Sequence, residues 1–500
     1  MNKIMVNNIL KVGFCLCAVF AFGCSPNTKS VSENLGKPNI IYILADDLGY
    51  GDLGCYGQEK IETPNIDKLA AGGIKFTNHY SGSTVCAPSR SSLMTGLHTG
   101  HTPVRGNKEH KPEGQQALPD SVTAIAQVMK TAGYATGAFG KWGLGFIGTT
   151  GDPNHQGFDQ FFGYNCQRQA HRYYPEYLWH NSKKVFLPGN DWKNKETYAQ
   201  DVIQEKTLAF IEANKDKPFF AFVPMVIPHA ELAAPEDSLL QKYRNKFTEE
   251  KPYKGGKGSA YGPDLKISRY QPQPEPRATF AAMVQRMDVY VGQIVEKLEK
   301  AGIADNTIIM FASDNGPHKE GGADPNFFQS NGELRGHKRD LYEGGIRTPF
   351  IVNWPSKVKA GQTSAHISAF WDILPTLAEI AGAEQVPEND GISFLPTILG
   401  EKDQAKHDNL YWEFVEQGGK QAVRKGDWKA VKVNVKENPD APIELYNLAK
   451  DLSEQNDVAS QHPDIVKEMN AIMDKSHESN QLFPLFSSES NDHKKVVSVD

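Results

Sequence analysis

The sequence has little of what would place it in a specialised class of protein. It has six cysteines, no basic stripe with interleaved aromatic residues, no internal repeat, and a net charge of −6. The charge and the missing basic stripe argue against a nucleic-acid-binding protein. The apolar run Val12–Gly23 is too short to span a membrane. Gly140–Gly145 is no dinucleotide-binding fingerprint, because Lys-Trp occupies its middle and no ribose-binding acid is evident.

The overall composition is typical of a soluble globular protein. Hydrophobic residues make up 39% and aromatic residues 10% of the 500 residues. This length allows a large core and two domains. The negative net charge still permits an anionic small substrate, because positive charge can gather in one cleft.

The first residues have the pattern of an export signal. Lys3 and Lys11 precede the apolar run, which ends in Ala21-Phe22-Gly23-Cys24. This ending resembles a bacterial lipoprotein signal, which implies cleavage and attachment of lipid to Cys24; an ordinary signal peptide cut nearby is the alternative. We expect residues 1–23 to be the signal peptide and residues 24–37 to be a polar tether. Both alternatives predict an exported protein, and the first predicts a periplasmic or cell-surface lipoprotein of a bacterium, held to the membrane only through Cys24.

The cysteines divide into groups. Cys15 and Cys17 lie in the signal, and Cys24 is the expected lipid site. Cys55 and Cys166 could form a disulfide in an oxidising compartment or could be isolated buried thiols. The sixth cysteine lies in a motif described below.

Residues 38–404 alternate between strand and helix patterns and are expected to form one catalytic domain. Apolar, β-rich runs suit strands that are covered on both faces, and helical patterns separate them. Such alternation favours an α/β sandwich around a largely parallel sheet. The expected strands are 39–45, 134–139, 218–223, 307–312 and 349–353, and the expected helices are 121–132, 196–214, 279–301 and 370–381.

The pattern changes after about residue 405. Short strand candidates at 409–414, 421–424, 428–433 and 443–447 precede a helix at about 463–475. They predict a small C-terminal α+β subdomain over residues 405–486 with an antiparallel sheet. Residues 487–500 are expected to be a mobile tail. Residues 231–277, rich in polar residues, proline and glycine, are expected to be a long surface excursion.

Acidic residues follow two of the expected strands. Asp46 and Asp47 come after the strand at 39–45, and Asp314-Asn315-Gly316 comes after the strand at 307–312. Ligands of open α/β sheets bind beyond the carboxyl ends of the strands. Three carboxylates at close range repel one another, and a divalent cation relieves that repulsion. Oxygen ligands of this kind suit Ca²⁺ or Mg²⁺; the alternative is that both motifs are ordinary turn formers.

The most informative stretch is Cys86-Ala87-Pro88-Ser89-Arg90, continuing to Thr95-Gly96. It resembles the signature of the sulfatase family, C-x-P-S-R followed by a helix that ends in T-G. In that family the cysteine is oxidised to formylglycine, whose hydrated aldehyde attacks the sulfur of a sulfate ester. The resemblance covers roughly residues 38–450. It implies an alkaline-phosphatase-like fold and a maturation partner, either a formylglycine-generating enzyme or an anaerobic sulfatase-maturing enzyme.

The resemblance also implies the metal site. Family members bind the metal through a D-D and an S-D-N-G motif together with the modified cysteine. In this chain the motifs imply a Ca²⁺ site, with Mg²⁺ as the alternative, whose ligands are Asp46, Asp47, Cys86, Asp314 and Asn315.

Cationic residues complete the implied catalytic set. Arg90 lies one helical turn after Cys86, at a helix N-terminus that suits an anion. Lys141 and Lys338 match the two lysines with which the family contacts sulfate, and their point charges suit its tetrahedral oxygens. His229 matches the family's P-H motif, which implies contact with the leaving oxygen as a general acid. Glu343 and Arg347, by contrast, are expected to be structural.

One position departs from the family pattern. The family has G-K-W-H-L-G where this chain has Gly143 in place of the histidine. His171 is our candidate for the missing sulfate contact. Arg168 and Arg172, from the same polar segment, are candidates for binding a second anionic group on a sugar; the alternative is a solvated loop.

The substrate implied by the resemblance is a sulfated saccharide. The first alternative is a phosphate or phosphonate monoester hydrolase of the same superfamily. The second is an inactive glycan-binding lipoprotein. The missing histidine favours this alternative, but the otherwise complete set of motif residues argues against it.

Overall fold

The computed structural model describes residues 36–191, 194–256 and 270–491. The chain divides into two compact units, residues 1–36 and 37–500, and the fold described below belongs to the second. The expected signal peptide and most of the expected tether therefore lie outside the described residues. Among the described residues, no helix is both long enough and apolar enough to cross a membrane.

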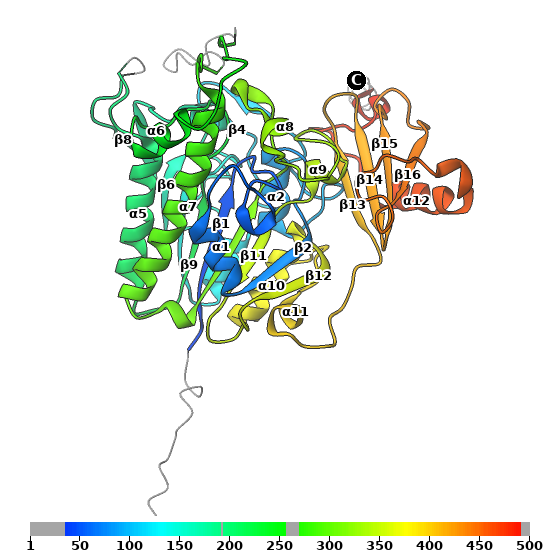
Figure 1. The fold of residues 1–500 in the computed structure, drawn as a ribbon. Coiled ribbons are helices and arrows are strands. Elements are labelled where there is room, and N and C mark those ends of the chain that lie inside the picture. The colour runs from blue at the N-terminus through cyan, green and yellow to red at the C-terminus, as the bar shows by residue number, and fades with distance from the viewer. Residues whose placement is uncertain (1–35, 192–193, 257–269, 492–500) are drawn as a thin grey trace, which may run out of the picture. The chain divides into compact units, whose positions relative to one another are not determined.

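A large mixed sheet forms the centre of residues 38–404 (Figure 1). Among the described residues it has ten strands in the order β12-β2-β11-β10-β1-β9-β5-β6-β7-β8. Strand β1 pairs in parallel with both β9 and β10. The pairs β5–β9, β5–β6 and β2–β12 are parallel as well. The strands are β1 Asn39–Ala45, β2 Ile74–Tyr80, β5 Ala135–Lys141, β6 Gln160–Tyr164, β7 Tyr177–His180, β8 Lys183–Phe186, β9 Phe219–Pro224, β10 Thr307–Ser313, β11 Phe350–Asn353 and β12 Gln362–Ala369. The expected α/β sandwich around a largely parallel sheet is confirmed.

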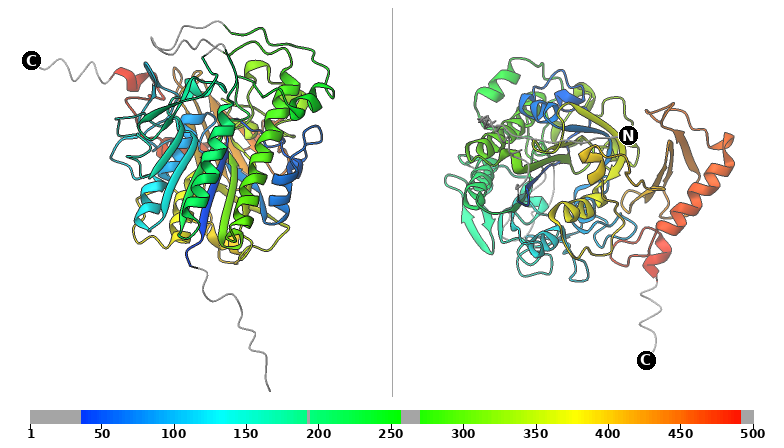
Figure 2. Two further views of the ribbon diagram at one scale, coloured as in Figure 1. Left: turned by 90° about the vertical axis from the view of Figure 1, so that its left-hand side faces the viewer. Right: turned by 90° about the horizontal axis from the view of Figure 1, so that it is seen from below.

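Alternate residues of β1 explain the two layers of helices. Ile41 and Ile43 pack in a core cluster with residues of α1, α5 and α7, whereas Ile40, Tyr42 and Leu44 pack in another with residues of α2, α3 and α10. Because successive side chains of a strand point to opposite faces, one continuous apolar strand buries both layers. Figure 2 shows the helices around the sheet from two further directions. These helices are α1 Pro64–Ala71, α2 Cys86–Thr95, α3 Ile125–Thr131, α5 Ala199–Asn214, α7 Pro276–Lys300 and α10 Ile373–Ala381.

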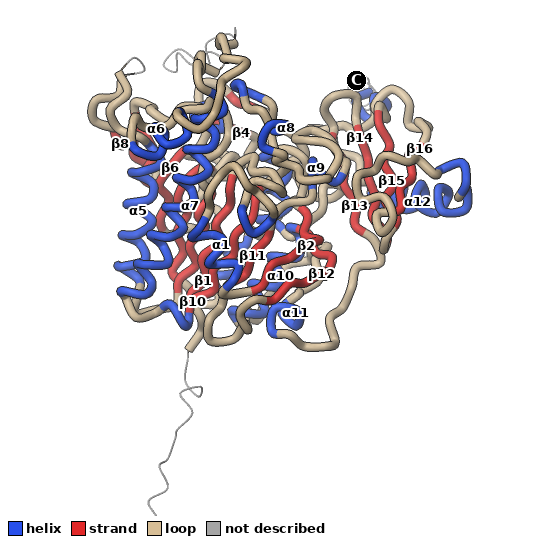
Figure 3. The backbone as a smooth tube through the Cα atoms, viewed as in Figure 1, coloured by secondary structure: helices blue, strands red, loops and turns tan. Residues whose placement is uncertain are grey.

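The C-terminal part forms a four-stranded antiparallel sheet beside this sandwich (Figure 3). Its strands are β13 Leu410–Phe414, β14 Lys420–Lys425, β15 Trp428–Val433 and β16 Ile443–Asn447. The helix α12, Pro463–Ser476, covers one face through Met469 and Met473. Trp412 on the other face packs with Tyr80 and Trp371 of the sandwich. The expected strands and closing helix are confirmed here within about one residue at each end.

The remaining elements are short, and several were not expected. The helix α6 lies in the segment 231–277 that we expected to be a surface excursion, of which residues 257–269 lie outside the described residues. Of the expected tail, Ser487–Asn491 forms a short 3-10 helix, and 492–500 lie outside the described residues. The further elements are β3 Glu109–His110, β4 Gly114–Gln115, α4 Gln167–Ala170, α6 Ser238–Arg244, α8 Pro325–Phe328, α9 Glu343–Ile346 and α11 Leu395–Leu399.

A partly buried histidine joins α12, β13 and the short 3-10 helix Ser487–Asn491. His477 Nδ1 lies 2.7 Å from Glu413 Oε2, and Nε2 lies 2.6 Å from Glu489 Oε1. Glu413 also accepts hydrogen bonds from Arg105 and Tyr411. Burial alone would lower the pKa of His477, but the two carboxylates outweigh it and raise the pKa above its usual value.

This arrangement predicts that the stabilising effect of His477 depends on pH. A raised folded-state pKa contributes stability that is complete below the unfolded-state value and is lost as pH rises through the folded-state value. His477→Gln is therefore expected to lower the free energy of unfolding more at pH 6 than at pH 9, by up to about 1.5–3 kcal/mol at the lower pH. Urea unfolding at both pH values measures this difference. The matched control is His155→Gln, at an exposed pair with Asp120; an equal loss at both pH values in His477→Gln would contradict the expectation.

Candidate active site

The acidic motifs meet at the carboxyl ends of β1 and β10. Ala45 pairs with Ser313 in the parallel register, so that Asp46 and Asp47 emerge beside Asp314 and Asn315. All four side chains are buried. The backbone N–H of Asp47 donates to Asp314 Oδ1 at 3.1 Å, and Asn315 Nδ2 donates to Asp47 Oδ1 at 2.7 Å. The structure thus brings together the residues that were expected to bind a metal, apart from Cys86, which arrives on another element.

The donor atoms of this cluster fit a hard divalent cation. Asn315 Oδ1 is buried and has no hydrogen-bond partner among the described residues. Burial and the neighbouring Asp46 disfavour a further negative charge and raise the pKa of Asp314 to about 7, an effect that a bound cation would offset. Burial also opposes ionisation of Asp47, but Lys338 and His229 outweigh it and hold its pKa well below the usual value. Carboxylate and amide oxygens are the ligands that Ca²⁺ and Mg²⁺ prefer.

Cys86 begins α2 and points into the same cluster. The preceding residue, Val85, is the N-cap and has an extended backbone, so that the helix begins at Cys86 and its first turn lies at the site. The Cys86 thiol donates to Asp46 Oδ1 at 3.3 Å and lies 3.8 Å from Lys338 Nζ. Burial, Asp314 and Asp46 raise the pKa of this thiol well above its usual value. An unmodified thiolate is therefore disfavoured here, and simple thiolate catalysis does not suit the site.

The other two described cysteines do not form a disulfide. Cys55 is partly buried and Cys166 is buried, and the two are not bonded to each other. The sequence left open whether these two cysteines pair with each other, and in the structure they do not.

Three cationic side chains surround the carboxylates. Arg90 donates through Nε and Nη2 to Asp314 Oδ2, at 3.0 and 2.9 Å. Lys141 Nζ lies 2.6 Å from Asp46 Oδ2, and Lys338 Nζ lies 2.7 Å from Asp47 Oδ2. Burial alone would lower the pKa of both lysines, but the facing carboxylates raise it instead. Both ammonium groups therefore stay charged although they are buried.

His229 lies beside Lys338 with a defined tautomer. Its Nδ1 contacts the carbonyl oxygen of Ala230, which can only accept, so Nδ1 carries the proton. Its Nε2 then faces Lys338 Nζ at 3.2 Å and Asp47 Oδ2 at 3.4 Å. The rings of His171 and His318 stack with that of His229 at centroid distances of 4.9 and 5.8 Å.

The expected substrate-binding residues have different surroundings. His171 and Arg168 line a cavity next to the carboxylate cluster. Arg168 makes a two-pronged ion pair with Glu109, whereas Arg172 is buried in an ion pair with Glu231 and does not line that cavity. Burial lowers the pKa of His171 well below its usual value, and His229 and Lys141 lower it further. The ring of His171 is therefore neutral.

Gly143 faces a side chain that the sequence did not single out. Gly143 has a φ of +79°, and a Cβ placed there would lie 3.0 Å from Gln167 Nε2. Gln167 is only 6% exposed, and its Nε2 has no partner among the described residues. His318, Glu320 and Tyr270 were also missed. For the first two a signal existed, because they lie only four and six residues after Asp314, in the loop that follows β10.

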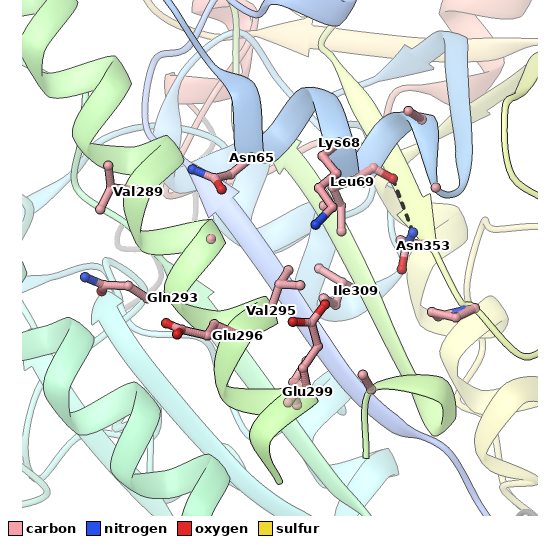
Figure 4. Close-up of a pocket in the computed structure, with 16 residues that line it drawn as sticks. Asn65, Lys68, Leu69, Val289, Gln293, Val295, Glu296, Glu299, Ile309 and Asn353 are labelled. Atoms are coloured by element: carbon pink, nitrogen blue, oxygen red, sulfur yellow. Dashed lines mark hydrogen bonds between the residues drawn. The ribbon is translucent and has the colours of Figure 1, made fainter. Parts of the chain in front are cut away.

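A larger cavity among the described residues lies elsewhere. It has a volume of about 770 Å³ and lies between α1 and α7, where Asn353 Nδ2 donates to the carbonyl of Leu69 (Figure 4). It reaches Ile309 in the first half of β10, whereas Asp314 follows the end of that strand. None of the acidic, cationic or histidine residues described above lines it. Cavity size therefore does not mark the active site in this protein.

Comparisons with known proteins agree with this geometry. A family model described as Sulfatase matches residues 38–383, and another described as N-sulphoglucosamine sulphohydrolase, C-terminal, matches residues 333–479. The N-acetylgalactosamine-6-O-sulfatase of Bacteroides thetaiotaomicron is 31% identical over 90% of this chain and 96% of its own. A crystal structure of Ps i-CgsB in complex with k-i-k-neocarrahexaose superposes with a TM-score of 0.74 at 29% identity, covering 93% of this chain and 98% of that one. The phosphonate monoester hydrolase of Agrobacterium radiobacter has a TM-score of 0.59 at 21% identity, covering 86% and 94%, and shares the fold alone.

Proposed function

The chain belongs to the sulfatase family and is a sulfuric ester hydrolase, and we propose that it desulfates a saccharide with a formylglycine derived from Cys86 and one bound Ca²⁺. The observation that carries this proposal is the position of Cys86. Its Sγ lies at the N-terminus of α2, within 4 Å of Asp46, Asp47 and Lys338. A buried thiol with a raised pKa is a poor nucleophile, but its site suits an oxygen nucleophile beside a cation.

The two added groups would supply chemistry that no unmodified side chain here has. A formylglycine at residue 86, made by a maturation enzyme of the generating or anaerobic type, supplies a hydrated aldehyde with one hydroxyl to attack sulfur and another to release sulfate. Bound Ca²⁺, or Mg²⁺ as the alternative, supplies positive charge to the oxygens around residue 86. Asp46, Asp47, Asp314 and Asn315 are the residues that would hold it.

The chain's own residues orient these groups and neutralise charge. Arg90 fixes Asp314 through two hydrogen bonds, so that carboxylate keeps one orientation. Lys141 and Lys338 stay protonated and supply positive charge for the sulfate oxygens, whose charge grows in the transition state. Because these groups are buried, they need little reorganisation when the substrate reacts.

His229 is the proposed partner of the leaving oxygen. Its protonated Nδ1 is bound to a backbone carbonyl, so only Nε2 is available for the alcohol that leaves. Nε2 accepts a hydrogen bond from the Lys338 ammonium, which stays protonated. To act as the general acid, His229 must gain a proton at Nε2 when the substrate binds, and it then passes that proton to the leaving oxygen.

A sulfated saccharide is the proposed substrate class. The relative from Bacteroides thetaiotaomicron is described as acting on N-acetylgalactosamine 6-sulfate, and the Ps i-CgsB structure contains a neocarrahexaose, which supports a sulfated sugar here. Measuring sulfate release from a panel of defined sulfated saccharides tests this proposal. Phosphate release from the matching phosphorylated sugars would favour the alternative of a phosphate or phosphonate hydrolase. Turnover of none, with retained glycan binding, would favour an inactive binding protein.

Export and lipidation remain part of the proposal. The motif Ala21-Phe22-Gly23-Cys24 supports a bacterial lipoprotein in the periplasm or at the cell surface. Incorporation of labelled palmitate into the wild-type chain, and its loss in Cys24→Ser, would support lipidation of that cysteine.

A polar residue of the 165–173 segment is proposed to replace the family histidine missing at Gly143. His171 is the proposed donor, and Gln167 is a second candidate because its amide faces Gly143. His171→Ala is expected to lower kcat/KM by roughly tenfold to a hundredfold, which corresponds to about 1–3 kcal/mol for an unmet buried polar group. Steady-state kinetics on a saccharide substrate measure this loss.

Two further variants complete that experiment. His155→Ala, at an exposed histidine, is the matched control and is expected to behave like wild type. If Gln167→Ala shows the loss and His171→Ala does not, the glutamine is the donor. Wild-type kinetics in both variants would contradict any replacement from this segment.

A further inference from the structure

A second cavity lies directly beside the carboxylate cluster. It has a volume of about 330 Å³, within the roughly 300–1,000 Å³ typical of small-molecule sites. His171 lines it and stacks on His229, whose Nε2 lies 3.2 Å from Lys338 Nζ. Lys338 Nζ in turn lies 3.8 Å from Cys86 Sγ. A sugar whose sulfate reaches residue 86 would therefore extend into this cavity.

The wall of the cavity carries more positive than negative charge. Arg168, Lys319 and Arg339 line it, against a single carboxylate, Glu320. Arg339 pairs with Glu320, and Arg168 pairs with Glu109, which does not line the cavity. Within the described part of the chain, the Lys319 ammonium has no ion-pair partner. The excess positive charge therefore resides on Lys319.

The rest of the wall suits the ring of a sugar. Tyr253 and Tyr270 line the cavity, and the ring of Tyr270 meets that of His171 edge to face at 5.1 Å. Such rings combine apolar faces with a polar tip, which matches a pyranose with both apolar and hydroxyl-bearing surfaces. Since His171 is neutral, it adds no charge to the wall.

We propose that this cavity binds a second anionic group of the substrate, either a sugar carboxylate or a further sulfate ester, and that Lys319 is its principal contact. The inference rests on the proposed function, because the first sulfate must occupy the site at Cys86. It changes the assignment expected from the sequence. Arg172 lies outside the cavity and Arg168 faces Glu109, so the binding charge comes from the loop after β10 instead. The substrate is then an acidic saccharide with at least two anionic groups.

Kinetics on three probes test this inference. The probes are N-acetylgalactosamine 6-sulfate, its 4,6-disulfate, and the 6-sulfate linked to a hexuronate. For each doubly anionic probe, its kcat/KM is divided by that of the singly anionic probe. Lys319→Gln is expected to lower this ratio by about tenfold, because a hydrogen bond to a charged group is lost. A fall confined to the disulfate identifies a second sulfate, and a fall confined to the hexuronate probe identifies a carboxylate. An unchanged ratio for both would overturn the inference.

A binding measurement separates this inference from the proposed function. Calorimetry with the same probes compares Cys86→Ala with Cys86→Ala/Lys319→Gln, and Cys86→Ala/Lys357→Gln is the control at an exposed lysine remote from the cavity lining. Tighter binding of a doubly anionic probe that depends on Lys319 supports the subsite, even if the wild-type enzyme releases no sulfate. Equal affinities for all probes in all variants overturn the subsite, even if sulfate is released.

Discussion

Cys86→Ala is expected to abolish sulfate release, with a fall in kcat on the order of 10⁴-fold or more, as for the loss of a covalent nucleophile in other hydrolases. The reason is local. Residue 86 is the only side chain at the N-terminus of α2 that contacts both Asp46 and Lys338 among the described residues. Alanine cannot be oxidised to an aldehyde, so neither the attacking oxygen nor the one that later releases sulfate can form.

The other described cysteines provide the controls for this prediction. Cys55→Ser and Cys166→Ala are expected to keep wild-type kcat, because both thiols lie outside the carboxylate cluster. Circular dichroism would verify that each variant is folded. Substantial sulfate release by Cys86→Ala would contradict the proposed mechanism, whatever the controls show.

Asp314→Asn is expected to remove the bound cation and, with it, turnover. The substitution takes one charge from a cluster of three carboxylates and keeps the size of the side chain, so the measured metal should fall from about one ion per chain to near zero. The fall in kcat is expected to be on the order of 10³-fold or more, because charge stabilisation by the ion is lost. Metal analysis by mass spectrometry after gel filtration, together with kinetics, measures both effects.

Asp52→Asn is the matched control for the metal prediction. Asp52 is buried close after the D-D motif, but its Oδ2 accepts from the backbone of Gly49 and it does not belong to the cluster. It is therefore expected to retain the ion. Because Asp314 also binds Arg90, Asn315→Ala provides a second test that leaves that ion pair in place. Full metal content in both Asp314→Asn and Asn315→Ala would contradict the assignment, and two zinc ions per chain would favour the phosphatase-like alternative.

The fold could be predicted where hydrophobic patterns were strong. The central strands β1, β9 and β10 are buried on both faces, so their sequences are continuous apolar runs. The edge strand β12 and its neighbour β2 are only partly buried and carry many polar residues, which made them hard to distinguish from loops. Their pairing depends on contacts across almost 290 residues, and no local pattern contains that information.

The candidate site could be predicted to the extent that it consists of strand and helix ends. Asp46, Asp47, Asp314 and Asn315 meet because β1 and β10 are parallel neighbours. The partners of Arg168 and Arg172 could not be predicted, since Glu109 and Glu231 each lie 59 residues away along the chain and meet them only in the folded protein. Gln167 was missed because its proposed role depends on the space beside Gly143, which lies 24 residues earlier in the chain. Only the folded structure shows that the two residues are neighbours.

The most direct test of the account is the mass of the peptide that contains residue 86, taken from active wild-type enzyme produced with a maturation partner. Conversion of the thiol to an aldehyde is a covalent modification and is expected to lower the mass of this peptide by about 18 Da. The hydrated form of the aldehyde has a mass close to that of the unmodified peptide. Labelling with a hydrazide reagent captures the aldehyde together with the hydrate that is in equilibrium with it, and so distinguishes both from the unmodified cysteine. The account predicts that the labelled fraction rises in proportion to kcat across preparations with different degrees of maturation. Full sulfatase activity in a preparation whose residue 86 is entirely an unmodified cysteine would contradict it.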